Sequence, residues 1–301
     1  MLNKVTNFLP SLNTFSSYAE ALPINRITKI VLFCIAAAGT TYAAIRLIRK
    51  VNYQGKSVFT YKALAWLGNP KAQYNHALMY AKGTNGVEHN KKLSFLTFKK
   101  AAEAGHAAAQ VELAKFYLSG EGVTQNYQTA FGWFEKAARQ NDLRATHNLG
   151  ILYYNGWGVA RDFALAFKCF KTALYSMSRS AGMIALMYMQ GQGVQRDYKE
   201  ALNYAKKAAE QDDPYGHYLL GEFYYHGWAG ITDLLAAKTH YQKAAQKSPK
   251  EFYNCALECE EGANGSSPNL HKAIMLYRYV AEVGYAPAQE KLESLNAQQE
   301  N

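Results

Sequence analysis

The chain has 301 residues, of which 49% are hydrophobic and 14% aromatic, and its formal net charge is +10. This apolar content is sufficient for a packed core and excludes a largely disordered chain. Before Glu88 the only acidic residue is Glu20, so most of the positive excess lies in the first third of the sequence. Farther along, acidic and basic residues are interspersed. The sequence therefore predicts no basic stripe and no nucleic-acid binding.

The N-terminal part contains an apolar stretch, residues 30–45, without a charge. A helix of that length would measure about 24 Å, so crossing a hydrocarbon core of about 30 Å requires extension to Ile48 with Arg46 reaching the headgroups. On this basis we predict a flexible tail over 1–25 and a single-pass transmembrane anchor over 26–49. More lysines and arginines follow the stretch than precede it, which places the repeats on the cytoplasmic or matrix side. A signal or mitochondrial targeting segment, or a buried helix, is the alternative.

Beyond this segment one pattern recurs at steps of 35 to 37 residues. A helix rich in small residues ends in a tyrosine, a Gly-x-Gly-Val turn follows, and a second helix closes on a small pair such as Ala137-Ala138. The turn glycines are Gly83, Gly120, Gly156, Gly191 and Gly227. A fixed period of this size predicts an α-solenoid, in which each helix pair buries its apolar side against its neighbours.

The same period sets the predicted domain limits. We expect an N-terminal capping helix over 56–68, six repeats over 72–284, and a C-terminal capping helix with a tail over 286–301.

Residue types inside the repeat follow from packing. A small residue in the middle of each first helix lets two helix backbones approach closely, and glycine in the turn permits a positive φ. The six small positions are Ala77, Ala114, Gly150, Ala185, Gly221 and Ala256. Large aromatic residues are expected to form a buried stripe on the second helices, at Trp133, Phe134, Phe167, Phe170, Tyr204 and Tyr241.

The third copy shows the pattern most fully, with Ala145, Leu149-Gly150, Leu152-Tyr153, Gly156, Gly158-Val159, Asp162, Ala166 and Ala173. In these residues the chain resembles the Sel-one-like repeat family, a short-turn relative of tetratricopeptide repeats. The resemblance covers about 72–281 and departs from the pattern at Gly227-Trp-Ala-Gly230 and in the long sixth turn. It implies an all-α, right-handed α-solenoid of helix-turn-helix repeats and a role as an adaptor in protein complexes.

No catalytic motif is found. The sequence contains no G-x-S-x-G, no phosphate-binding glycine loop and no H-E-x-x-H. His217 and His226 lie nine residues apart, which does not place them on one helix face. The four cysteines, Cys34, Cys169, Cys255 and Cys259, do not recur at the repeat period. We interpret Cys255 and Cys259 as two small core residues that share a helix face; a redox or metal pair is the alternative. We therefore predict no enzyme, no cofactor, no metal site and no small-molecule substrate.

A groove for a protein partner is the remaining candidate site. In tetratricopeptide-like stacks the first helices line a concave groove that binds an extended segment or a helix. The variable position two residues before each small residue is the candidate contact, at Asn75, Glu112, Asn148, Met183, Leu219 and Asn254. The three asparagines could bond a partner's backbone, or they could link neighbouring repeats.

Together these features predict a membrane-anchored, non-catalytic adaptor that binds protein partners through its concave face. The alternatives are a structural subunit of a larger membrane complex, of mitochondria or of another membrane, and a secreted pathogen effector that acts through protein binding. An enzyme acting on cell-wall glycans would require paired carboxylates in the groove.

Overall fold

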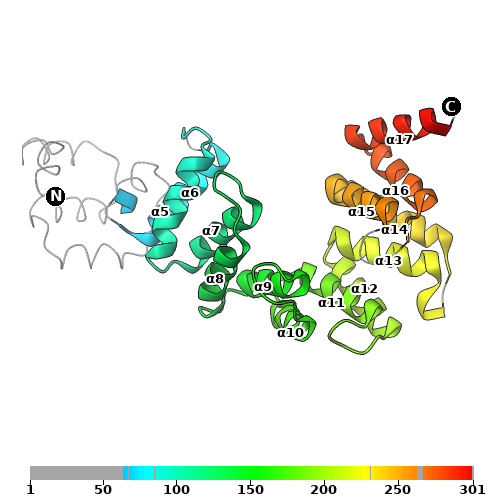
Figure 1. Cartoon of the computed structure of the whole chain (residues 1–301), viewed down its shortest axis with the longest axis horizontal. Coiled ribbons are helices and arrows are strands. Elements are labelled where there is room, and N and C mark those ends of the chain that lie inside the picture. The colour runs from blue at the N-terminus through cyan, green and yellow to red at the C-terminus, as the bar shows by residue number, and fades with distance from the viewer. Residues whose placement is uncertain (1–63, 67, 85, 231, 263–266, 300–301) are drawn as a thin grey trace, which may run out of the picture. The chain divides into compact units, whose positions relative to one another are not determined.

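The computed structural model describes residues 64–66, 68–84, 86–230, 232–262 and 267–299. Within these ranges every regular element is a helix and no strand occurs (Figure 1). The chain divides into two compact units, Met1–Asp142 and Leu143–Asn301, which are described separately. The predicted all-α class, with repeated helix pairs, is confirmed.

The first unit contains two helix pairs among its described residues. Its helices are α5 (Pro70–Lys82), α6 (Lys91–Glu103), α7 (Ala107–Ser119) and α8 (Tyr127–Ala138). Each helix packs on the next one along the chain, α5 on α6, α6 on α7, and α7 on α8.

The second unit continues the alternation of first and second helices. Its elements are α9 (Leu143–Asn155), α10 (Phe163–Ala173), α11 (Ser178–Gln190), α12 (Tyr198–Glu210), α13 (Pro214–His226), the short 3-10 helix η3 (Trp228–Gly230), α14 (Leu234–Lys247), α15 (Pro249–Glu261), α16 (Leu270–Glu282) and α17 (Ala286–Gln299). Consecutive helices pack on each other. The first helices of neighbouring repeats also contact each other; α11, for example, packs on α13. Helix α17 packs on α16 and ends the described chain (Figure 1).

One polar residue starts every second helix. In each case an Asn or Asp side chain accepts a hydrogen bond from a backbone N–H in the first turn, a cap that stabilises a helix by about 1 kcal/mol. These caps are Asn90, Asn126, Asp162, Asp197, Asp233 and Asn269. The first helices end at left-handed glycines such as Gly83 and Gly120. The predicted positive φ at the turn glycines is confirmed.

The small position of the first helix lies where two helices come close together. A Cβ atom added to Gly150 would lie 2.7 Å from the ring of Phe170, and one added to Gly221 would lie 2.5 Å from the ring of Tyr241. The alanines at the equivalent positions are fully buried. Close approach of the two helices, as predicted, therefore explains the choice of residue.

The aromatic stripe of the second helices is only partly buried. Phe134, Phe170 and Tyr241 lie in the core, whereas Trp133, Phe167 and Tyr204 are half-buried. Trp133 and Phe134 differ because adjacent residues on one helix point to different sides.

The prediction of a single-pass membrane localisation is contradicted. Among the helices of the described residues none is long and apolar enough to cross a membrane. Helices α5 to α17 contain 11 to 14 residues each, so they are about 16–21 Å long against a core of about 30 Å. The predicted tail over 1–25 and anchor over 26–49 lie outside the described residues, as does most of the predicted cap over 56–68, of which residues 64–66 are helical.

Candidate protein-binding groove

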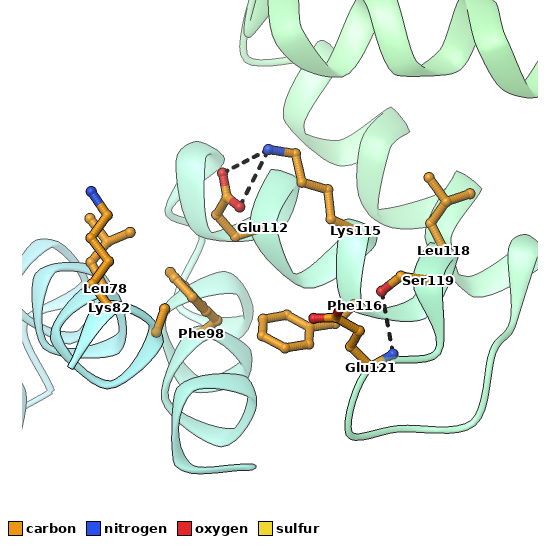
Figure 2. A pocket seen from close by; sticks show the side chains of 10 residues that line it. Leu78, Lys82, Phe98, Glu112, Lys115, Phe116, Leu118, Ser119 and Glu121 are labelled. Carbon is orange, nitrogen blue, oxygen red and sulfur yellow. Dashed lines mark hydrogen bonds and ion pairs between the residues drawn. The ribbon is translucent and has the colours of Figure 1, made fainter. Parts of the chain in front are cut away.

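A groove of about 500 Å³ opens between α5 and α7 in the first unit (Figure 2). We call it the α5–α7 groove. Leu78, Ala81 and Lys82 line it from α5, where a spacing of three and four residues puts them on one face of the helix. Figure 2 shows Leu78 and Lys82 on one side of the groove and Glu112, Lys115 and Phe116 of α7, the first helix of the next repeat, on the other.

Two phenylalanines form the apolar part of the groove. Phe98 of α6 and Phe116 of α7 have ring centroids 6.1 Å apart and a tilted arrangement that aromatic pairs favour. Phe98 is buried, while Phe116 and Leu118 are half-buried. The half-buried faces provide apolar area that a partner could cover.

Charged residues surround this apolar part. Glu112 and Lys115, three residues apart on α7, form an ion pair of 3.1 Å. Glu121, just after α7, pairs with Lys91 at 3.3 Å. Exposed pairs of this kind are worth less than about 1 kcal/mol, so a partner's charges can replace them at little cost. Lys82 forms no ion pair with any residue of the described part.

Of the six predicted contact residues only Glu112 lines this groove. Asn75, also in the first unit, is half-buried on α5 one turn before Leu78. The other four belong to the second unit. There Asn148 donates to the Arg144 carbonyl at 2.7 Å, Met183 packs against the core, Leu219 is buried and Asn254 is exposed. Leu219 is inaccessible to a partner, and the role of the others stays a prediction.

Sequence reasoning missed Leu78 and Lys115, the residues directly after the small position. A usable signal existed, because Asn75 and Leu78, like Glu112 and Lys115, are three residues apart and share a helix face. No feature of the sequence marks Phe98 and Phe116 as groove residues, because phenylalanines at helical spacing are usually part of the core.

In the second unit a carboxylate and an ammonium group are buried together. Lys272 Nζ donates to Glu222 Oε2 at 2.5 Å, and the Tyr241 hydroxyl donates to Glu222 Oε1 at 2.7 Å. Burial acts to raise the pKa of Glu222, but hydrogen bonds from His226, Lys272 and Tyr241 and the charge of Lys272 outweigh burial and lower it. The charged groups satisfy one another, so we assign the cluster a structural role.

The structure also pairs two histidines that looked scattered in the sequence. His217 Nδ1 of α13 and His240 Nδ1 of α14 lie 3.1 Å apart. Burial lowers the pKa of both, to about 4 for His240, so the pair is uncharged at neutral pH. Within the described residues no group of three or more His, Cys, Asp or Glu side chains could hold a metal ion.

The cysteine pair of α15 is half-buried, and Cys255 and Cys259 are free thiols. Burial, with nearby carboxylates, raises the pKa of both thiols, which keeps them protonated and unreactive. This supports their interpretation as packing residues.

Stacked helix pairs with a solvent-facing groove define an α-solenoid repeat protein. The Sel1 repeat model matches six segments, 70–106, 107–142, 143–176, 177–213, 214–249 and 253–285, which together cover more than half of the sequence. The chain therefore belongs to the Sel1 repeat family, as its resemblance predicted.

Proteins similar to this chain include two solved structures and one curated sequence. A protective antigen of uropathogenic Escherichia coli with this fold is 28% identical, with a TM-score of 0.55, over 99% of this chain and 67% of that one. A Sel1 repeat protein from Oxalobacter formigenes is 28% identical, with a TM-score of 0.59, over 74% of this chain and 92% of that one. An uncharacterized protein of Neisseria meningitidis serogroup B is 31% identical over 113 residues, or 37% of this chain. The match spans only 23% of the length of that relative.

Proposed function

We propose that this protein is a non-catalytic adaptor that binds a segment of a protein partner in the α5–α7 groove. The observation that carries the proposal is the groove itself, which combines half-buried apolar side chains, Leu78 and Phe116, with an ion pair between Glu112 and Lys115 at its edge. Sel1 repeat proteins are typically scaffolds for protein interactions, which agrees with this use of the first helices.

The chemistry of the groove favours one kind of occupant. An amphipathic segment would place two or three apolar side chains against Leu78 and Phe116. A carboxylate on the segment would lie near Lys82, whose ammonium group has no carboxylate partner in the described part of the chain. This is the common mode in which a peptide is held by apolar anchors and oriented by a few charges.

A site-specific photo-crosslinking experiment tests the proposal in the cells that make the protein. A photoreactive amino acid replaces Leu78 or Lys115 in the full chain, and Tyr175, 92% exposed in the second unit, is the control position. We expect one discrete protein adduct from both groove positions and none of that mass from position 175. Absence of an adduct from the groove, or the same adduct from all three positions, would contradict the proposal.

A charge exchange provides a matched variant. Glu112→Lys combined with Lys115→Glu keeps the net charge and leaves two opposite charges three residues apart on α7. Stability should change by less than about 0.5 kcal/mol, while the crosslinked adduct should weaken because the charges facing the partner have changed places. An unchanged adduct would mean that the charges at the groove do not orient the partner.

The same experiment separates an adaptor from its alternatives. A structural subunit of a larger complex would give an adduct in every preparation and comigrate with its partner on native gels. A secreted effector would give an adduct only when proteins of a second organism are present.

A further inference from the structure

Six lysines gather on the second helices of the second unit. Each side chain is exposed, and none forms an ion pair with any residue in the described ranges. They are Lys168 on α10, Lys199, Lys206 and Lys207 on α12, and Lys238 and Lys243 on α14. We call this set the outer lysine face.

Contacts connect the second helices that carry these lysines. Lys171 of α10 donates to the Tyr204 hydroxyl of α12 at 2.5 Å. Lys247 of α14 forms an ion pair with Asp212, two residues after the end of α12. Helix α10 therefore contacts α12, and the end of α14 contacts the segment that follows α12. The six lysines lie on the solvent-exposed sides of these three helices.

Carboxylates are frequent in this part of the sequence but do not neutralise the lysines. Asp162, Asp197 and Asp233 are the N-caps of these three helices and keep their negative charge while they accept backbone N–H groups. With Glu200, Glu210 and Asp212 they make six carboxylates, against eight lysines on α10, α12 and α14, so an excess of two positive charges remains. The sequence thus looks balanced although this surface carries a net positive charge, which attracts anionic partners.

Exposed leucines accompany the lysines. Leu234 and Leu235, in the first turn of α14, are 62% and 75% exposed. They precede Lys238 by four and three residues, so the leucines and the lysine share one side of α14. A single exposed leucine is ordinary, but two adjacent ones beside unpaired lysines form a mixed apolar and cationic surface.

We propose that the outer lysine face binds an acidic protein segment that carries aliphatic side chains. Carboxylates of the segment pair with lysines of α12 and α14, and its aliphatic side chains cover Leu234 and Leu235. This surface is separate from the α5–α7 groove, so the inference goes beyond the function proposed above.

Two features favour a protein segment over a nucleic acid or a lipid surface. A phosphate backbone offers no apolar group to cover the leucines. An extended anionic surface would also bring phosphates against Glu200 and Glu210, whereas a peptide can place its carboxylates opposite lysines only.

Fluorescence anisotropy with the full chain tests the proposal, with a short labelled peptide of Glu-Glu-Leu repeats as the probe. The combination of Lys206→Glu, Lys238→Glu and Lys243→Glu should weaken binding by about tenfold. Leu234→Ser with Leu235→Ser should weaken it by about threefold or more, because apolar area is lost. Replacement of leucine by serine in the peptide should have a similar effect.

The matched control makes the same change of net charge elsewhere. Lys92, Lys99 and Lys100 are exposed lysines of α6 in the first unit, and their replacement by glutamate should leave the affinity within about twofold of the original. Equal weakening by both triple variants would overturn the proposal, because binding would then follow net charge alone. No binding of the peptide would overturn it too, as would binding of an oligonucleotide or of phosphatidylserine vesicles in its place with the same dependence on these lysines.

Discussion

A buried ion pair in the second unit links residues fifty positions apart. Glu222 is 6% and Lys272 is 7% exposed, and each would be costly to bury alone. The pair joins the first helix of one repeat, α13, to the second helix of the next, α16. Neither charge has its partner unless α13 and α16 lie in the arrangement that brings Glu222 and Lys272 together. The pair therefore favours that one arrangement of the two helices.

Loss of one partner should therefore be severe. We expect Lys272→Met to lower the free energy of unfolding by about 3–5 kcal/mol, since the Glu222 carboxylate would stay buried without its cation. Urea denaturation followed by circular dichroism measures the change. Arg179→Met, which breaks the more exposed pair with Glu251, should cost less than about 1 kcal/mol. If Lys272→Met with Glu222→Leu is as unstable as Lys272→Met alone, the buried charge is not the cause.

A buried histidine makes the second unit sensitive to acid. His147 Nδ1 lies 2.8 Å from the Ser180 hydroxyl, and burial, together with the charge of Arg179, lowers its pKa from 6.5 to about 4. In the unfolded chain the imidazole takes up a proton near pH 6.5, whereas in the folded chain it does so only near pH 4. The folded state therefore binds fewer protons in this interval, and stability falls as the pH is lowered through it.

The size of this effect can be measured directly. Between pH 6.5 and 4 His147 alone should remove about 3 kcal/mol from the free energy of unfolding. His147→Gln keeps a hydrogen-bonding group and removes the titration, so its stability should depend less steeply on pH over this range. Parallel pH curves for the two proteins would show that His147 is not responsible. His240, whose pKa is lowered in the same sense, remains in both proteins and contributes equally.

At the scale of the helix the position of a glycine decides its role. Gly132 of α8 and Gly150 of α9 both lie inside helices, where glycine is less favourable than alanine by about 1 kcal/mol. No atom lies within 4 Å of a Cβ added to Gly132, but the Phe170 ring lies 2.7 Å from a Cβ added to Gly150. Of these two glycines, only Gly150 is needed for the packing of α9 on α10.

The two alanine substitutions should thus act in opposite directions. Gly132→Ala should raise the free energy of unfolding by up to about 1 kcal/mol, because helix propensity improves without a clash. Gly150→Ala should lower it by about 1–3 kcal/mol, because α9 and α10 must move apart. Thermal unfolding of both variants measures the signs. Stabilisation by Gly150→Ala would show that the Phe170 ring can move aside freely.

At the scale of the whole molecule, stability is expected to be local. Repeats contact their neighbours in sequence, and the chain forms two compact units. In such an array a defect weakens the adjacent repeats most. Lys272 lies on α16 and contacts Glu222 on α13. Replacement of Lys272 should therefore destabilise mainly the C-terminal part of the second unit.

Hydrogen exchange should report this locality. In the Lys272→Met protein we expect faster amide exchange in α13 to α16 and unchanged exchange in α5 to α8. Mass spectrometry of peptic fragments resolves the two regions. A uniform acceleration across both units would mean that the chain unfolds as one cooperative body.

Much of the architecture was predictable because it depends on short stretches of sequence. The glycine of each turn and the residue that caps each second helix act on backbone groups within a few positions, so their consequences can be read locally. The small residue of each first helix was recognisable for the same reason, since it recurs at one place in the period. The single-pass membrane prediction is contradicted by the helices of the described residues, none of which is long and apolar enough to cross a membrane. The apolar stretch on which it depended, 30–45, lies outside those residues.

The candidate surfaces were less predictable because they depend on how helices pack. The sequence did not single out Phe98 or Phe116, and the tertiary structure places both at the α5–α7 groove. The charges of the second unit appear balanced along the chain. On the second helices of that unit lysines are in excess, because α10, α12 and α14 carry eight lysines and only Glu200 and Glu210 besides their aspartate caps.

The sequence by itself determined the helical repeat, its period, its turns and its family, since these follow from local backbone geometry and a regular pattern of small and large residues. Tertiary structure decided which distant side chains meet, including Glu222 with Lys272 and His217 with His240. The physical reason is that a contact between helices depends on their rotation and separation, which are set by the packing of many side chains at once.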